Sequence, residues 1–211
     1  MTASRPQLHV DANHYSPYAM SAFVALTEKG VAFDLVRVDL AAGANRAPDF
    51  AALSATRRVP TLVHDGFSLS ESSAIDEYVD EVFDGPALYP RDARDRARAR
   101  QVQAWIRSDL MPIRAERSTE FVFAKPVAKP LSEAARAAAG TLFAAAGGWL
   151  ADGRAHLAGD AWCIADVDLA LMLNRLVFAG DDVPAPLADY ARRQWARPSV
   201  QRWVALSAAR G

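Results

Sequence analysis

The chain has 211 residues, of which 51% are hydrophobic and 23% charged, a composition typical of a globular protein and unlike that of a disordered one. The formal net charge of −1 gives no support to nucleic-acid binding, and the single cysteine excludes an internal disulfide or a dithiol redox pair. No stretch approaches the ~20 apolar residues of a membrane span, the start of the chain lacks a signal-peptide core, and the four histidines lie too far apart for a metal site. We therefore expect a cytoplasmic protein with no metal, no membrane and no nucleic-acid partner.

The first part of the chain mixes strand and helix patterns. Met20, Phe23 and Val24 recur at helical spacing, and Asp65-Gly66 is a hairpin signal between two short apolar runs. We expect strands at 8–11, 33–40, 59–64 and 67–69, and helices at 17–29, 47–53 and 72–83. This order, βαβ and then αββα, predicts an α/β domain over residues 5–85, in which helices pack on a four-stranded sheet.

The rest of the chain shows helical patterns throughout. We expect helices at 91–116, 132–150, 165–177, 186–195 and 199–208, and hence an all-α domain over residues 91–211. The first of these is one long helix or two joined ones, with Pro112 as a candidate kink. Aspartates stand one helical turn from arginines in 91–100, which favours a solvated or dimer-facing helix over a nucleic-acid patch.

Ser16-Pro17 is the first candidate for chemistry. Serine before proline is an ordinary helix start, with Ser16 as N-cap and Pro17 as the first helical residue. The same position can activate a thiol, because free N–H groups and the positive dipole end of a helix stabilise a thiolate. A hydroxyl donated by Ser16 would add a hydrogen bond to the charged sulfur.

Two further segments allow both a structural and a functional interpretation. Pro60 either opens a strand after a turn or leaves a neighbouring backbone open to an extended ligand, and a cis Val59-Pro60 bond would be a special geometric feature. In the segment 69–75, serine either caps a helix, with Glu71 on its dipole, or the segment is a clamp for a zwitterion. In the clamp, the helix N–H groups and the Ser72 hydroxyl hold a ligand carboxylate, and Glu71 holds an ammonium group.

Together, these segments resemble the glutathione site of the glutathione transferase superfamily. The βαβ–αββα order resembles the thioredoxin-like N-terminal domain of that superfamily, which is followed by an all-helical C-terminal domain. Ser16-Pro17-Tyr18-Ala19 resembles the Cys-Pro-Tyr-Cys of glutaredoxins with both cysteines lost, which fits transferase chemistry. The resemblance covers essentially the whole chain and is closest to bacterial transferases of the YfcF type, through Ser-Pro-Tyr and the segments 56–60, 69–75 and 96–114.

The resemblance implies roles for six residues. Ser16 is the implied catalytic residue, facing the glutathione sulfur. The backbone of Val59, beside a cis Pro60, would pair with the cysteinyl part of glutathione. Glu71 and Ser72 would bind the γ-glutamyl end. The glycine carboxylate would be bound by Arg58, next to which stands a second arginine.

A fourth segment, 162–166, resembles a helix-start motif of the C-terminal domain. Cys163 takes the cap position and Asp166 would accept backbone N–H groups there. We expect this pair to serve folding, with Cys163 as a buried small residue.

The implied activity is that of a glutathione transferase. Glutathione, as co-substrate and without a metal, would be activated as thiolate for attack on a small electrophile or a hydroperoxide, in detoxification. The resemblance also implies a homodimer and a second-substrate pocket contributed by the C-terminal domain. The alternatives are a non-catalytic glutathione-binding or interaction protein on the same scaffold and a glutathione-dependent isomerase.

Overall fold

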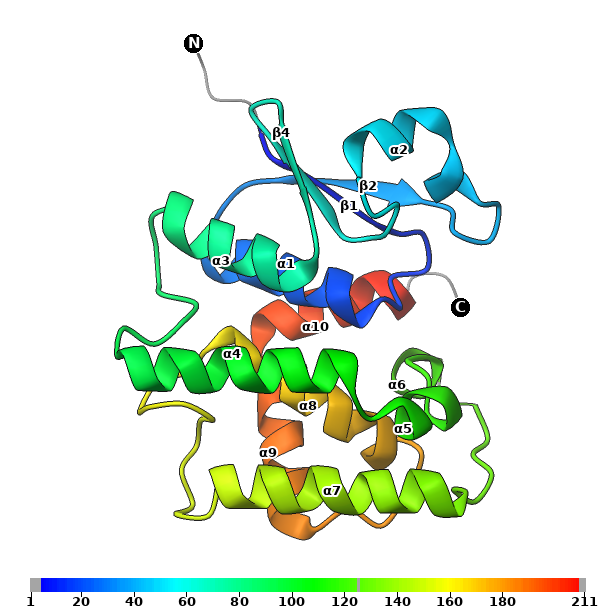
Figure 1. Cartoon of the computed structure of the whole chain (residues 1–211), viewed down its shortest axis with the longest axis vertical. Helices are drawn as coiled ribbons and strands as arrows, with labels where there is room; N and C mark the ends of the chain where they lie inside the picture. Colours follow the sequence, from blue (N-terminus) through cyan, green and yellow to red (C-terminus); the bar gives the residue numbers. More distant parts are fainter. Residues whose placement is uncertain (1–4, 125, 209–211) are drawn as a thin grey trace. The chain divides into compact units, whose positions relative to one another are not determined.

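The computed structural model describes residues 5–124 and 126–208 and divides the chain into two compact units (Figure 1). Unit 1 comprises the described residues up to Leu88 and those from Arg202 on, and unit 2 runs from Tyr89 to Gln201. Within the described ranges, no helix is both long enough and apolar enough to cross a bilayer.

Unit 1 contains a four-stranded mixed sheet with the strand order β2-β1-β3-β4. β1 pairs in parallel with β2 and antiparallel with β3, which in turn pairs antiparallel with β4. Asp65 and Gly66 join β3 to β4 with φ angles of 48° and 81°, the two positive values that a tight hairpin turn requires. The strands are β1 (Gln7–Asp11), β2 (Asp34–Val38), β3 (Thr61–His64) and β4 (Phe67–Ser70).

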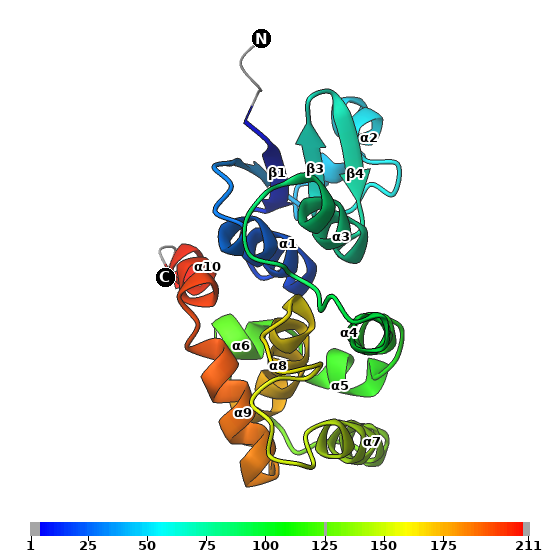
Figure 2. The same ribbon diagram turned by 90° about the vertical axis from the view of Figure 1, so that its left-hand side faces the viewer.

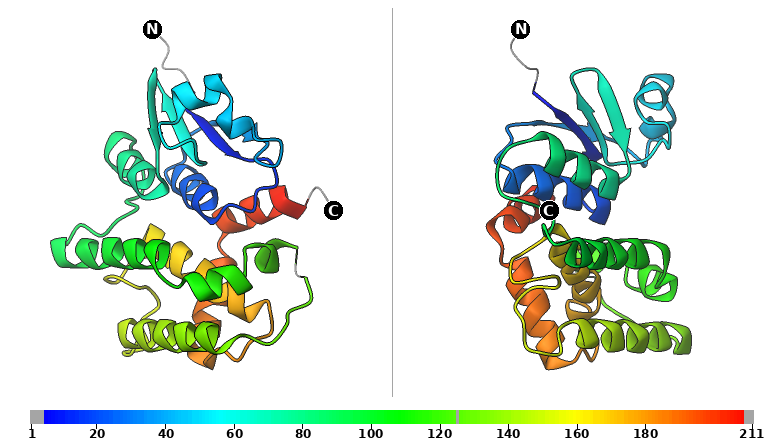
Figure 3. Two further views of the ribbon diagram at one scale, coloured as in Figure 1. Left: turned by 45° about the vertical axis from the view of Figure 1, so that its right-hand side comes forward. Right: turned by 60° about the vertical axis from the view of Figure 1, so that its left-hand side comes forward.

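Helices cover both faces of this sheet. α1 (Pro17–Glu28) and α3 (Ser72–Val82) lie together on one face, whereas α2 (Pro48–Leu53) lies on the other (Figure 3). The buried Ser21 hydroxyl of α1 donates to Asp76 Oδ2 of α3 over 2.9 Å, which ties the two helices together. The short 3-10 helix η1 (Ala44–Arg46) precedes α2.

The last helix, α10 (Pro198–Ala208), contributes its later residues to unit 1. Trp203 is fully buried, and its ring packs against those of His14 and Phe23, with centroids 5.2 Å and 5.3 Å away. Trp203 of α10 thus completes the core of unit 1 beside α1.

Burial of His9 is expected to make the stability of unit 1 sensitive to acid. The side chain lies between β1 and Phe50 of α2, and burial lowers the pKa of its imidazole because the protonated form loses its hydration. In the unfolded chain His9 therefore binds a proton near pH 6.5, whereas in the folded chain it binds one only at lower pH. The free energy of unfolding consequently falls as pH drops below about 6.5.

We expect a His9→Gln variant to lose this component. In urea unfolding, the wild type should lose up to about 1.4 kcal/mol per pH unit more than the variant between pH 6.5 and the folded-state pKa. Above pH 7.5, where His9 is neutral in both states, the difference between the two proteins should be independent of pH. Parallel pH dependence below pH 6.5 would show that His9 does not titrate on unfolding.

Unit 2 is built around one buried helix, α8 (Ile164–Val177). α8 packs against α4 on one side and α9 on the other, and α7 contacts α5 and α9 (Figure 2). Almost every side chain of α8 is buried, because neighbours surround it. The other helices are α4 (Ala93–Ser108), α5 (Met111–Glu116), α6 (Glu120–Phe123), α7 (Glu133–Trp149) and α9 (Ala185–Trp195).

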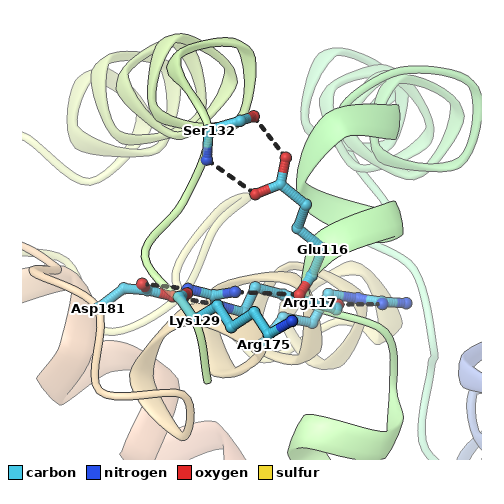
Figure 4. Close-up of polar contacts among 6 residues, drawn as sticks. All are labelled: Glu116, Arg117, Lys129, Ser132, Arg175 and Asp181. Atoms are coloured by element: carbon cyan, nitrogen blue, oxygen red, sulfur yellow. Dashed lines mark hydrogen bonds and ion pairs between the residues drawn. The ribbon is translucent and has the colours of Figure 1, made fainter. Parts of the chain in front are cut away.

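A charged network holds the segment between α5 and α7 (Figure 4). The Arg117 guanidinium, 2% exposed, donates to both carboxylate oxygens of Asp181 over 2.6 and 2.7 Å and to the Lys129 carbonyl over 2.8 Å. This hydrogen bonding to Asp181 raises the pKa of Arg117. Arg175 donates to the Arg117 carbonyl, and Glu116 accepts from the backbone and hydroxyl of Ser132.

The fold class is confirmed: an α/β unit of βαβ–αββα order is followed by helices. The segment 91–116 is two helices, because Asp109 is extended and Leu110 has a φ of 59°. Pro112 does not kink a helix but stands in the first turn of α5, where its missing N–H costs nothing. Two short elements, η1 and α6, were not predicted, since neither is long enough to show a periodic pattern.

Candidate active site

Ser16 is the N-cap of α1, with Pro17 in the first turn, as expected. The Ser16 hydroxyl oxygen accepts the N–H of Ala19 over 3.2 Å. No residue in the described part of the chain accepts the proton of this hydroxyl. The structural interpretation of Ser16 is therefore correct, and it leaves the hydroxyl proton available to an external acceptor at the positive end of the helix.

Val59 has a buried side chain and an open backbone. The side chain, 9% exposed, packs with Val38 and Phe50, and the Val59-Pro60 bond is cis. β3 begins only at Thr61, so Val59 lies outside the ladder. Neither its N–H nor its carbonyl forms a hydrogen bond within the described residues. This backbone can pair with an extended ligand.

The loop before Pro60 is held by its carbonyls and leaves its cationic side chains exposed. The Arg58 carbonyl accepts from the hydroxyls of Thr61 and Ser54, over 2.9 and 3.2 Å, and the Arg57 carbonyl accepts from Asn45 over 3.0 Å. Both arginine side chains are exposed and form no ion pair with described residues. They present positive charge beside Val59, where a ligand carboxylate would be stabilised.

Glu71 occupies an unusual backbone conformation. It is the N-cap of α3 with a φ of 74°, although it is not glycine, and its side chain forms no capping hydrogen bond. Such strained conformations cluster at functional sites. Its exposed carboxylate has no partner among the described residues. The serine-cap interpretation is wrong here, since Ser72, only 3% exposed, is already the first helical residue.

The sheet register brings these segments to one edge. His9 pairs with Thr61, and Thr61 pairs with Ser70. The end of β1, the start of β3 and the end of β4 therefore meet, and the segments with Ser16, Val59 and Glu71 extend from them. The edge combines a hydroxyl donor, an open backbone and an unpaired carboxylate, all within unit 1.

Sequence reasoning missed Asp11, the last residue of β1. Its carboxylate is 7% exposed and accepts the N–H of Tyr15 at Oδ2 over 2.6 Å and that of Ser16 at Oδ1 over 3.1 Å. An aspartate just before a polar loop is a known turn signal, since its side chain can bind backbone N–H groups a few residues on. That signal was available in the sequence.

Cys163 is a buried residue in the core of unit 2, as expected. It is the N-cap of α8 and fully buried. Burial, followed by the negative charge of Asp166, raises the pKa of its thiol well above the ordinary range. A thiol that resists ionisation is a poor nucleophile. No group of His, Cys, Asp and Glu side chains in the described chain is arranged to hold a metal ion.

Comparison with known proteins finds similarity along most of the chain. The family model "Glutathione S-transferase, N-terminal domain" matches residues 15–82, and "Glutathione S-transferase, C-terminal domain" matches residues 92–209. The crystal structure of a glutathione transferase homolog from Burkholderia, with bound glutathione, shares 48% identity and superposes with a TM-score of 0.79, covering 97% of this chain and 98% of that one.

Two curated relatives show how far the similarity extends. Glutathione S-transferase 3 of Zea mays is 31% identical over 92% of this chain and 86% of its own length. Maleylacetoacetate isomerase of Rhizobium meliloti is 40% identical over 43% of this chain and 42% of its own length. The chain spans only 39% to 44% of several other curated relatives. With both domain models matched and one relative aligned over 86% of its length, the chain belongs to the glutathione S-transferase family.

Proposed function

We propose that this protein is a glutathione transferase that holds glutathione as a thiolate at the start of α1. One observation carries the proposal: the Ser16 hydroxyl accepts the Ala19 N–H and has no acceptor for its own proton among the described residues. A sulfur placed there gains one hydrogen bond and the positive end of the helix dipole, and both stabilise the anion.

The remaining contacts are assigned to groups at the same sheet edge. The Val59 N–H and carbonyl pair with the cysteinyl backbone of glutathione. Glu71 binds the γ-glutamyl ammonium, while Ser72 and the first N–H groups of α3 bind its carboxylate. Arg58 binds the glycine carboxylate. In this proposal residues 5–85 form the glutathione-binding domain, and residues 91–211 contribute the pocket for the second substrate.

In the chemical step, the thiolate attacks an electrophilic carbon, a carbon–sulfur bond forms, and the leaving group departs with the bonding electrons. With a hydroperoxide, the sulfur attacks the outer oxygen, an S–O bond forms as the O–O bond breaks, and glutathione becomes its sulfenic acid. The departing alkoxide takes a proton from water to become the alcohol. Ser16 holds the sulfur anion in both cases and donates no proton to the product.

The affinity for glutathione should depend on Glu71. A charged hydrogen bond contributes about 1.5–3 kcal/mol, so Glu71→Ala should raise the dissociation constant in calorimetry roughly 10- to 100-fold, with a smaller change in the pKa of the bound thiol. Glu71→Gln isolates the charge and should show most of the effect.

Glu81 provides a matched control, because it is an exposed carboxylate on the same helix, one residue before its end. Glu81→Gln should leave the dissociation constant unchanged. An unchanged constant in Glu71→Ala as well would remove Glu71 from the site.

The similarity to the maleylacetoacetate isomerase of Rhizobium meliloti favours a glutathione-dependent isomerase as the second candidate. A substrate panel separates the activities: an activated aryl chloride consumes glutathione by conjugation, an organic hydroperoxide oxidises it, and a cis-configured unsaturated diketo acid is isomerised without consuming it. Binding of glutathione without turnover of any of the three would support the non-catalytic alternative.

We also propose a cytoplasmic homodimer. Phe67 of β4, which is 49% exposed beside the Tyr78 ring of α3, is the side chain that we assign to the contact between the subunits. Light scattering behind size exclusion should give twice the chain mass, whereas the mass of one chain would contradict the dimer.

A further inference from the structure

The loop between β1 and α1 is organised by one buried carboxylate. The Asp11 oxygens accept the N–H groups of Tyr15 and Ser16, and the Asp11 carbonyl accepts the N–H of His14 over 3.0 Å. The Ala12 N–H continues the pairing of β1 with β2 by donating to the Val38 carbonyl. Three backbone N–H groups of the five-residue loop 12–16 therefore donate to Asp11.

The loop has little freedom to reach this shape by other means. His14 has a φ of 57°, which a residue with a side chain adopts at a cost, and its ring is fixed edge-on against the buried Trp203. Pro17 fixes the backbone after Ser16, and the Ala19 N–H holds the Ser16 hydroxyl oxygen. The bond from the Ser16 N–H to Asp11 holds the backbone before it.

The negative charge of Asp11 is unfavourable for a thiolate bound nearby. A buried carboxylate near a bound thiolate repels it, so by electrostatics alone Asp11 would oppose the activation of glutathione. Burial of the carboxylate is also unfavourable unless hydrogen bonds compensate for it. The Asp11 carboxylate favours the thiolate only if it stabilises the thiolate by orienting the loop more than it destabilises the thiolate by charge repulsion.

We infer that Asp11 is a positioning residue for the glutathione chemistry: its carboxylate fixes the loop 12–16 so that the Ser16 hydroxyl is aimed at the sulfur. The inference rests on the proposed function of Ser16. Asp11 touches neither the sulfur nor the second substrate, and it acts through the backbone of Ser16, as the supporting contacts of a preorganised site do.

The two effects of Asp11 predict opposite results for Asp11→Asn. The variant keeps the side-chain volume but removes the charge and one acceptor oxygen. If positioning dominates, the pKa of the bound thiol rises by about one unit, a tenfold loss of thiolate at neutral pH. If electrostatic repulsion dominates, the pKa falls.

The test is a double-mutant cycle, read from the thiolate ultraviolet signal of bound glutathione across pH. Asp11→Asn should raise the thiol pKa in the wild-type background and have no further effect in the Ser16→Ala background, because its action passes through Ser16. In the conjugation assay, kcat should fall while the dissociation constant of glutathione changes less than about threefold.

Asp39→Asn is the matched control, since the exposed Asp39 carboxylate caps another loop of unit 1 by accepting the Ala42 N–H over 3.0 Å. It should leave the thiol pKa unchanged. Hydrogen exchange on the ligand-free protein gives a second measurement: the Ser16 amide should exchange faster in Asp11→Asn and unchanged in Asp39→Asn.

The outcomes separate this inference from the proposed function. A thiolate in the wild type with an unchanged or lower thiol pKa in Asp11→Asn, or an equal shift in the Ser16→Ala background, overturns the positioning role alone. Unchanged exchange of the Ser16 amide overturns it too. No thiolate in the wild type overturns the proposed function and the positioning role together.

Discussion

Ser16→Ala is expected to slow conjugation at neutral pH about tenfold, because loss of the hydroxyl raises the pKa of the bound thiol by about one unit, or 1.4 kcal/mol. The hydroxyl proton has no other acceptor in the described chain, so its only assigned partner is the ligand sulfur. The same substitution also removes the N-cap of α1, which costs about 0.5–2 kcal/mol of stability.

Two variants distinguish the loss of the hydroxyl donor from the loss of the helix N-cap. Ser16→Gly lacks the hydroxyl, but glycine is a tolerable N-cap, so this variant should lose the thiolate with only a small loss of stability. Ser16→Thr should keep both the thiolate and the stability of the helix start. Ser132→Ala removes a comparable cap from α7, where Ser132 Oγ accepts the Ala135 N–H, and should leave the thiol pKa unchanged. Wild-type thiol pKa and rate in Ser16→Gly would show that the hydroxyl is not used.

The largest loss of stability is expected for Asp166→Ala. The Asp166 carboxylate is fully buried and accepts from three donors: the N–H of Leu157, the N–H of Cys163 and the Tyr190 hydroxyl, over 2.8, 2.9 and 2.6 Å. Removing it leaves all three donors unsatisfied, at about 1–3 kcal/mol each before relaxation, so we expect a loss of about 3–5 kcal/mol in urea unfolding.

A graded series tests the cause. Tyr190→Phe removes one of the three donors and should cost only about 1 kcal/mol, and Asp166→Asn should fall between the two because one acceptor oxygen remains. Asp166→Ala within about 0.5 kcal/mol of the wild type would show that the three contacts contribute nothing net.

Much of the fold was predictable because local signals agreed with the global arrangement. The Asp65-Gly66 turn, the Ser16-Pro17 helix start and the switch from strand to helical spacing fixed the element order, and the observed bounds differ by a few residues. The break at Leu110 was not predictable, because a leucine with positive φ is selected by packing and carries no local signal. Trp203 joins the core of unit 1 through contacts distant in sequence, which no periodicity encodes.

The candidate site was predicted in part. Ser16 and Glu71 stand at helix starts, where residue type alone suggests chemistry, whereas the role of Val59 was implied only by the family resemblance. The strand register brings the segments that carry all three to one edge. Their open groups emerge only from the hydrogen-bond pattern: the unpaired backbone of Val59 and the strained φ of Glu71 are properties of the folded chain. The role of Asp11 also depends on where a buried carboxylate points. The assignment to the YfcF-type subgroup stays a prediction.

The most direct test of the account is the thiolate ultraviolet difference spectrum of glutathione bound to the purified protein, recorded across pH. We predict a thiolate signal that persists at least one unit below about pH 8.5, the ordinary pKa of a free thiol, and that moves back toward it in Ser16→Ala. Binding of glutathione with a thiol that ionises at its ordinary pKa would contradict the activation of glutathione at α1.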